Sequence, residues 1–152
     1  MLIVGVFFEP VSMADIFTNK KRSELMSRIR SRGNVATELR FIQILKFASI
    51  TGWRRNQKVF GKPDFIFRRN RLAIFVDGCF WHGCPRCYKR PKSNRKFWDA
   101  KIGRNHERDR IVSHELRRLG WRVVRIWEHD LARRGDSCAR RIARSLLSRP
   151  PR

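Results

Sequence analysis

Two spacings of hydrophobic residues alternate along the chain and predict helices on either side of a group of strands. Residues 22–32 (RSELMSRIRSR) and 34–49 (NVATELRFIQILKFAS) carry apolar positions at helical spacing. Leu25 and Ile29 are four apart in the first segment, and Val35, Ile42 and Leu45 share one stripe in the second. That spacing is typical of a helix with one buried face. We therefore expect two helices before the first strand.

Four later segments are rich in Phe, Val and Ile and predict β-strands. They are residues 54–60 (RRNQKVF), 64–69 (DFIFRR), 71–78 (RLAIFVDG) and 121–129 (WRVVRIWEH). The third is almost continuously apolar, as expected of a strand buried on both faces. A turn centred near Arg69 and Asn70 joins the second strand to the third, so we expect these two to pair antiparallel.

Two further helices complete an α/β pattern. A long polar segment runs from about residue 94 to residue 119, where Gly120 stops it, and residues 137–147 predict a closing helix. A chain of this length buries about 70% of the surface that it exposes when unfolded, which is enough for a normal core. We expect a single domain over residues 13–148 and a frayed tail over residues 149–152.

The first twelve residues, MLIVGVFFEPVS, are apolar but predict neither a membrane anchor nor a secretion signal. No Lys or Arg precedes the apolar run, and the run is far too short to span a bilayer. Met13 begins a more ordinary polar start. We expect residues 1–12 to be a disordered leader or the result of a misplaced start codon, and the protein to be cytoplasmic.

The charge of the chain narrows the choice of partner. It contains 36 Lys and Arg against 13 Asp and Glu, a formal net charge of +23. A field of this size attracts polyanions over long distances, and nucleic acid is the commonest polyanion that proteins bind. Charge therefore indicates nucleic-acid binding, but it does not indicate whether a bound nucleic acid is also cut or modified.

Three cysteines lie close together and predict a metal centre. Cys79, Cys84 and Cys87 follow a C-x4-C-x2-C spacing, and the CPRC pair is typical of a zinc knuckle. Without a secretion signal, a metal fits them better than disulfides do, and free thiols are the alternative. Structural zinc needs four ligands. Sequence alone leaves these candidates for the fourth: His82, His106, His114, His129 and Cys138.

Three acidic residues stand where the pattern does not favour an acid. Glu38 falls on the helix face that should enter the core, where a carboxylate needs a partner or a metal. Asp64 opens one strand and Asp77 ends the next, so an antiparallel pairing brings them to one open end, about 5–8 Å apart. Two such carboxylates can share a hydrated Mg²⁺. The alternatives are a buried ion pair for Glu38 and strand-end caps for the other two.

The cysteine loop also contains a histidine and large aromatic residues. His82 is either a zinc ligand or a free imidazole, and a free imidazole is a natural general base at neutral pH. Phe80 and Trp81 are adjacent and cannot both enter a core, so they and Trp98 are candidates for wedging between bases. Taken singly, each aromatic is more often a core residue.

The long predicted helix carries two polar residues on its apolar stripe. Asn105 and Asp109 share that stripe with Trp98, Ile102, Val112 and Leu116. Polar groups there need hydrogen-bond partners. We expect a structural hydrogen-bonding role for both, with support of a nearby active site as the second interpretation.

Four motifs in order along the chain resemble one family, the very short patch repair endonucleases that nick bacterial DNA at mismatches. The motifs are GKPDFIF, FVDGCFWHGCPRC, FWDAKIGRNHERD and LGWRVVRIWE, preceded by MADIF, RSELMSRIRSR and ATELR. The similarity extends from about residue 13 to residue 144. It implies a restriction-endonuclease-like fold of the PD-(D/E)xK type: a mixed sheet flanked by helices, with an embedded structural zinc site.

The resemblance assigns roles to residues that match the family's motifs. It makes Asp64 a metal-binding aspartate, His82 the catalytic base rather than a zinc ligand, and Glu38 a support for the site. It also implies intercalation into DNA by Phe80, Trp81, Trp98 and, from the N-terminal helix, Met26.

At two points this chain departs from one well-known form of the family. Asp77 stands where that form has Thr, so its carboxylate could add to the Mg²⁺ site with Asp64. Cys84 stands where that form has His, and His129 where it has Cys. We therefore expect zinc at Cys79, Cys84, Cys87 and His129, with Cys138 as the reserve ligand.

The function implied is Mg²⁺-dependent nicking 5′ to the thymine of a T:G mismatch, the lesion left when 5-methylcytosine deaminates. The resemblance further implies a monomer that acts on double-stranded DNA, with functional links to a cytosine-5 DNA methyltransferase and a repair polymerase. The alternatives are a nuclease of the same fold that cuts unmismatched DNA and a non-catalytic zinc module that binds nucleic acid.

Overall fold

The structure of the protein is a computed structural model that describes residues 35–148, all within one compact unit of the chain. Four expectations concern residues outside this range. They are the helix over residues 22–32, the role of Met26, the leader over residues 1–12 and the tail over residues 149–152.

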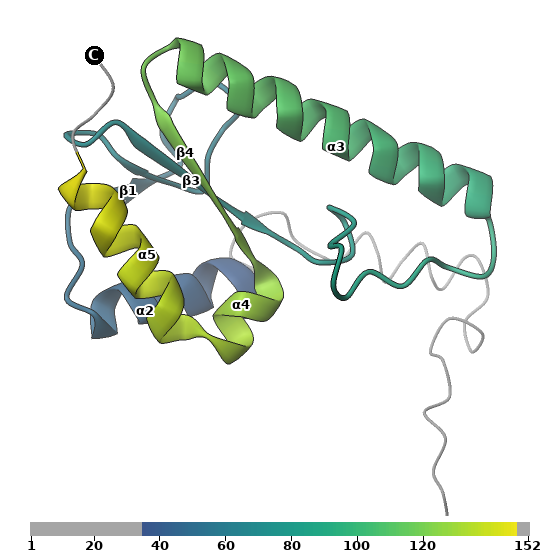
Figure 1. Ribbon diagram of the computed structural model, residues 1–152, viewed down its shortest axis with the longest axis horizontal. Coiled ribbons are helices and arrows are strands. Elements are labelled where there is room, and N and C mark those ends of the chain that lie inside the picture. Colours follow the sequence, from purple (N-terminus) through teal and green to yellow (C-terminus); the bar gives the residue numbers. More distant parts are fainter. Residues whose placement is uncertain (1–34, 149–152) are drawn as a thin grey trace, which may run out of the picture. The chain divides into compact units, whose positions relative to one another are not determined.

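A four-stranded mixed sheet forms the centre of the fold (Figure 1). Its strands lie in chain order, with β1, β2 and β3 antiparallel and β4 parallel to β3. The parallel pairing follows from the long helix that crosses over between β3 and β4. The strands are β1 (Trp53–Arg55), β2 (Phe65–Phe67), β3 (Leu72–Asp77) and β4 (Arg122–Trp127).

Helices cover both faces of the sheet, so the expectation of an α/β fold with a mixed, helix-flanked sheet is confirmed. Helix α3 lies along one face, and α2, α4 and α5 are grouped on the other (Figure 1). None of the helices described is long and apolar enough to cross a membrane. The helical elements are η2 (Val35–Leu39, a π-helix), α2 (Arg40–Phe47), α3 (Arg95–Arg118), α4 (Glu128–Arg133) and α5 (Gly135–Leu147).

The larger part of the core lies between the sheet and the group of α2, α4 and α5. Phe41 of α2 and Phe65 of β2 meet edge to face at 5.0 Å between ring centroids, and Ile142 of α5 is fully buried beside them. On the other face, Leu116 of α3 packs against Ala73 and Phe75 of β3. Strand β3 is thus covered on both faces, as its continuous apolar run predicted.

Two of the predicted boundaries are wrong. The strand expected over residues 54–60 ends at Arg55, because Asn56 has a left-handed φ of 53° and the chain then turns, with Val59 N donating to the Gln57 carbonyl. The strand expected over residues 121–129 ends at Trp127, and the next residues begin helix α4.

Candidate active site and metal centre

Two of the three acidic residues, Asp64 and Asp77, lie at one end of the β2–β3 pair. Phe65 pairs with Ile74, so Asp64 lies across from the following residues of β3, as the position of the turn predicted. Its Oδ2 accepts a hydrogen bond of 2.8 Å from the backbone N–H of Val76. Asp77 ends the same strand one residue later, so strand pairing alone brings both carboxylates to one edge.

Asp64 is held in surroundings that disfavour its charge. Burial raises its pKa to about 6, and the negative charges of Glu38 and Asp77 add to the rise. The hydrogen bond from Val76 and the charge of Arg125 oppose the rise without cancelling it. Acidic groups that repel one another in a poorly hydrated place favour a bound cation, so the donor set fits Mg²⁺.

Glu38 reaches the same region from the helical segment that precedes β1. It lies in the π-helical turn η2, is 5% exposed and forms an ion pair with Arg55 of β1. Single π-helical turns are rare and often occur at functional sites. The structure therefore contains the buried ion pair considered from the sequence, within electrostatic reach of Asp64.

Asp77 has a partner that the sequence reasoning did not name. Arg125, in the middle of β4, donates from Nε to Asp77 Oδ2 at 2.6 Å and from Nη2 to Asp77 Oδ1 at 2.7 Å. The same Nη2 lies 3.0 Å from Oδ1 of Asp109 on α3. The available signal was an arginine at the centre of the apolar run VVRIW, since a charge in a strand of this kind needs a partner.

His82 is paired with an acid through one ring nitrogen. Its Nδ1 lies 2.5 Å from Asp109 Oδ2 and 3.7 Å from Asp77 Oδ1. Burial raises the pKa of Asp109, but the hydrogen bond from His82 and the charge of Arg125 outweigh burial and hold the pKa below its usual value. Asp109 is therefore an ionised acceptor, so Nδ1 is the donor in this hydrogen bond and Nε2 is the ring nitrogen left for other contacts.

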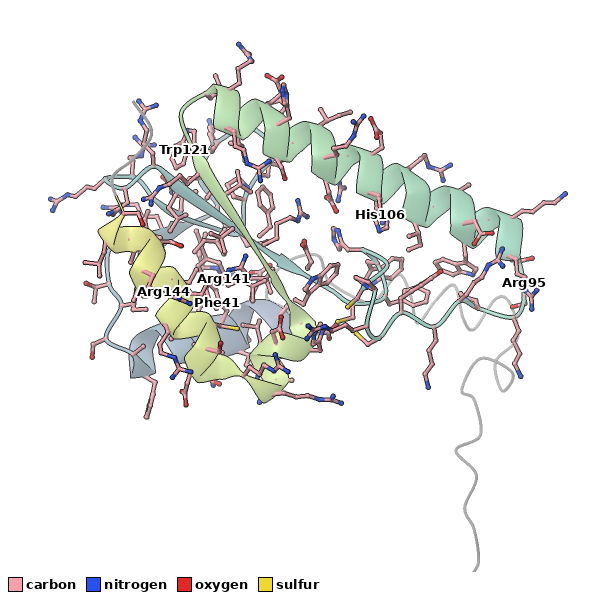
Figure 2. The ribbon with its side chains drawn as sticks, in the orientation of Figure 1. Phe41, Arg95, His106, Trp121, Arg141 and Arg144 are labelled. Carbon is pink, nitrogen blue, oxygen red and sulfur yellow. The ribbon has the colours of Figure 1, made fainter. Side chains whose placement is uncertain are left out.

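Helix α3 fixes the loop that carries His82. Asn105 donates from Nδ2 to the Trp81 carbonyl at 2.6 Å, so the hydrogen-bonding role expected for it is present. His106, which projects from α3 towards the loop in Figure 2, donates from Nε2 to the His82 carbonyl at 2.7 Å. Two side chains from adjacent helical positions thus hold two adjacent loop carbonyls, which restricts where the imidazole can lie.

The loop approaches α3 too closely for a side chain at Gly83. Its φ is +54°, and a Cβ there would lie 2.8 Å from Ile102 Cγ2 and 2.9 Å from His106 Nε2. We expect Gly83→Ala to lower the free energy of unfolding by about 1–3 kcal/mol, through strain at this φ and displacement of α3. Urea denaturation measures the change.

Gly103 offers the matched control for that substitution, because it lies in α3 with open space around its missing Cβ. Gly103→Ala is expected to raise the free energy of unfolding by about 0.5–1 kcal/mol. Equal and small effects of the two substitutions would show that the loop does not rest on α3.

The cysteine loop meets the first turn of α4 in a four-residue cluster. The ligand atoms of Cys79, Cys84, Cys87 and His129 all lie within 4.8 Å of one another. His129 Nδ1 is 3.3, 3.6 and 3.5 Å from the three sulfur atoms in that order. A tetrahedral zinc ion with ordinary bond lengths separates a sulfur and a nitrogen ligand by about 3.6 Å. The cluster therefore has the donor types and the spacing that fit zinc.

Contacts around the cluster support the same conclusion. Burial raises the pKa of the Cys79 thiol to about 12, so this group needs a cation to become a thiolate. Glu128 Oε2 accepts a hydrogen bond of 3.0 Å from Cys79 N, which ties the start of the loop to α4. His129 Nε2 lies 3.3 Å from Asp130 Oδ1, so this acid is placed to orient the ring.

The other candidates for a fourth ligand lie elsewhere. Cys138 is a residue of α5 and is 6% exposed in the larger core, His106 donates to the His82 carbonyl, and His114 is an exposed residue beside Glu115.

The aromatic residues of the loop form a cluster separate from both parts of the core. Phe80 meets Trp81 at 5.3 Å and Trp98 at 5.1 Å between ring centroids, and the two tryptophans are 6.1 Å apart. Neither core cluster contains these three residues. Phe97, the neighbour of Trp98, is 57% exposed at the start of α3, where Arg95 also projects outwards (Figure 2). Trp98 is buried at 9% exposure and Phe80 and Trp81 are half-buried, so Phe97 is the exposed member of this aromatic group. Aromatic side chains with basic neighbours are suited to contact with nucleic acid.

Comparison with known proteins agrees with this site. The family model described as DNA mismatch endonuclease Vsr matches residues 14–89. DNA mismatch endonuclease Vsr of Escherichia coli K12 is 39% identical over 118 residues, which cover 76% of this chain and 74% of the relative. Type II nicking enzyme V.NmeAIP of Neisseria meningitidis serogroup A is 38% identical over 137 residues, covering 87% and 94%.

A third relative is similar over a shorter region. Type II nicking enzyme V.NaeI of Lentzea aerocolonigenes is 49% identical over 69 residues, covering 45% of this chain and 42% of the relative. The resemblance drawn from the four motifs is confirmed by these matches. The protein is a DNA endonuclease and belongs to the Vsr family of DNA mismatch endonucleases.

Proposed function

We propose that the protein nicks duplex DNA 5′ to the thymine of a T:G mismatch, in repair of deaminated 5-methylcytosine. The observation that carries this proposal is the approach of an Asp109–His82 pair to the buried acids of the β2–β3 edge, beside an aromatic cluster. Family membership supports the mismatch as substrate, since the matching model and the E. coli relative are both described as mismatch endonucleases.

The acids and the cysteine cluster would hold two metals with different tasks. Asp64 and Asp77 would bind Mg²⁺, which supplies positive charge to the scissile phosphate and the leaving oxygen. Arg125 takes one lone pair from each oxygen of Asp77, and the second lone pair of each remains for a cation. Zinc would sit at Cys79, Cys84, Cys87 and His129, where it ties the loop to α4 and fixes His82 and the aromatic residues.

The protein's own groups move the proton. His82 accepts a proton at Nε2 from the attacking water, while its Nδ1–H remains hydrogen-bonded to Asp109. The negative charge of Asp109 stabilises the positive charge that the ring gains. Glu38, held by Arg55, orients the water. Cleavage of the P–O3′ bond leaves a 5′-phosphate and a 3′-hydroxyl that a polymerase can extend.

The basic surface and the aromatic cluster bind the substrate. Lys and Arg contact the phosphates, and Phe80, Trp81 and Trp98 wedge beside the mismatch, where stacking is already weak. Met26 would add a wedge from the N-terminal segment, outside the described residues. Binding should therefore fall steeply as the salt concentration rises.

The fold proposed is the PD-(D/E)xK type. Asp64 follows Pro63 and so matches the PD of the motif, and Asp77, which ends the next strand, matches its second acid. Cys79 occupies the position of the lysine. We further propose a cytoplasmic monomer with functional links to a cytosine-5 DNA methyltransferase and a repair polymerase.

A nicking assay on matched duplexes tests the proposal. Purified protein with Mg²⁺ is given one duplex with a T:G mismatch and the same duplex with T:A. A nick on the thymine strand of the mismatched duplex alone is the expected result. Equal cutting of both would retain the nuclease and reject the mismatch, and binding without cutting in several sequence contexts would favour a non-catalytic zinc module.

The role of Asp109 gives a separate prediction. Asp109→Asn is expected to lower the single-turnover nicking rate by about 10²-fold or more, since an amide can donate to Nδ1 and hold the wrong tautomer of His82. DNA affinity should stay within a factor of about two because Asp109 contacts His82 and Arg125. Asp99→Asn, on the exposed face of the same helix and paired with Arg90, is the control and should nick normally.

A further inference from the structure

Arg125 connects groups that have different tasks in the proposed reaction. Its guanidinium spans Asp77 at the end of β3 and Asp109 on α3, and Asp109 in turn holds His82. The group lies 4.8 Å from the centroid of the Phe75 ring, so an aromatic face supports it on one side. Nη1 is buried and has no hydrogen-bond partner among the described residues.

The groups around this guanidinium resemble the ligands of a metal ion. One ligand atom each from Asp77, His82 and Asp109 lie within 4.8 Å of one another, a spacing at which two carboxylates and an imidazole could bind a divalent ion. Two carboxylates this close repel each other unless a cation lies near both. Arg125 is that cation, and it is covalently part of the chain.

Many phosphodiester-cleaving sites place a second divalent ion about 3.5–4 Å from the first. We propose that Arg125 takes the place of such a second ion in this protein, as a positioning residue that neutralises Asp77 and Asp109 and confines divalent ions to the Asp64 side of the site. This inference rests on the proposed function for its catalytic meaning, although its metal-binding consequence can be measured without catalysis.

The substitution of a side chain for an ion has a clear chemical benefit for His82. A divalent ion bound by Asp77 and Asp109 would bind His82 Nδ1, the ring nitrogen that faces these two acids. A neutral ring bound through Nδ1 carries its proton on Nε2, which could then no longer act as the base. A guanidinium offers only N–H donors and, unlike a metal ion, does not form a coordinate bond with an imidazole nitrogen. It occupies Oδ1 of Asp109 and leaves Oδ2 for the Nδ1–H of His82.

The test counts Mn²⁺ ions, which report divalent binding by paramagnetic resonance. Zinc-loaded wild type, Arg125→Met and Arg122→Met are titrated without DNA. Arg122 is the matched control, because it lies on the same strand and donates to the Asn70 carbonyl, with no acidic partner among its described contacts. We expect Arg125→Met to bind one more Mn²⁺ per chain than wild type, and Arg122→Met to bind the same number as wild type.

Thermal unfolding of the same proteins gives a second readout. Arg125→Met leaves two acids without their counter-charge, so its Tm should fall without Mn²⁺ and be largely restored by it, far beyond any effect on Arg122→Met. An unchanged ion count, or a loss of Tm that Mn²⁺ does not restore, would overturn the inference.

Arg125→Lys keeps the test decisive if the methionine variant does not fold. Lysine keeps the charge but cannot donate to both acids in a fixed plane. It should lower single-turnover nicking by about 10-fold or more with unchanged DNA affinity, and nicking at the wild-type rate would contradict a positioning role. Asp64→Asn separates the two proposals, because it removes the wild-type ion but leaves the extra ion of Arg125→Met.

Discussion

Asparagine at position 64 is expected to abolish nicking and, without Mg²⁺, to make the protein more stable than wild type. The amide has the shape of the carboxylate and can accept the hydrogen bond from Val76, but it carries no charge for Mg²⁺. Because a bound metal ion and acid–base catalysis each lower the barrier by several kcal/mol, we expect the single-turnover rate to fall by at least about 10³-fold. DNA binding should remain close to that of wild type.

The gain in stability follows from the pKa of Asp64, which burial raises from its ordinary value of 3.8 to about 6. A raised pKa in the folded state means that the fold disfavours the ionised carboxylate relative to the protonated carboxyl. Its contribution is fully present below about pH 4 and is lost as the pH rises through about 6. At pH 8 the ionised group therefore lowers the free energy of unfolding by about 3 kcal/mol, which Asp64→Asn recovers.

Urea denaturation of wild type and Asp64→Asn at pH 4 and pH 8, with zinc retained, measures this difference. The two proteins should be equally stable at pH 4 and differ at pH 8, and added Mg²⁺ should stabilise only the wild type. A variant that is less stable than wild type at pH 8 would mean that the Asp64 charge is already compensated. Loss of DNA binding by a folded Asp64→Asn would contradict a role confined to the metal.

Alanine at Cys84 is expected to remove zinc, lower the melting temperature by at least about 10 °C and abolish nicking. Cys84 is 1% exposed and its sulfur lies 3.6 Å from His129 Nδ1, at the point where the loop meets α4. Structural zinc sites bind with apparent free energies of about 10–16 kcal/mol, much of which is folding free energy. Without that link, the loop loses one of its two supports, and the imidazole and the aromatic cluster lose their fixed positions.

Cys138→Ala provides the comparison, because Cys138 is also a buried cysteine but belongs to the core-facing side of α5. It should keep one zinc ion per chain by atomic absorption and nick normally. Loss of zinc from both variants would make Cys138 a ligand. Retention of zinc by Cys84→Ala would remove that residue from the set.

Local patterns were sufficient to predict most of the fold. In a hairpin, the position of the turn sets which residues of the two strands face each other. The turn at Arg69 and Asn70 therefore predicted the register of β2 and β3, and with it the contact between Asp64 and the end of β3. The apolar stripe of the long helix placed Asp109 on the correct face. The end of β1 was missed because Asn56 adopts a left-handed φ that composition does not encode.

The partners of the site could not be predicted in the same way. Arg125 is 48 residues from Asp77 and meets it only because β4 pairs parallel with β3. The pairing of Asp109 with His82 likewise depends on how the loop packs on α3. Contacts between distant segments are set by tertiary packing, and no spacing within one segment reports them.

The parallel pairing of β3 with β4 has a consequence for the timing of activity during synthesis. A chain still attached to the ribosome and exposed as far as Leu119 already contains Asp64, Asp77, His82 and Asp109, yet it lacks the β4 arginine and the α4 histidine. Phe75 pairs with Arg125, which lies 50 positions later in the chain, and pairings over such sequence distances form late. A strongly cationic nascent chain can therefore meet nucleic acid before the candidate active site exists, and that site is completed only when residues 125–129 have also been released.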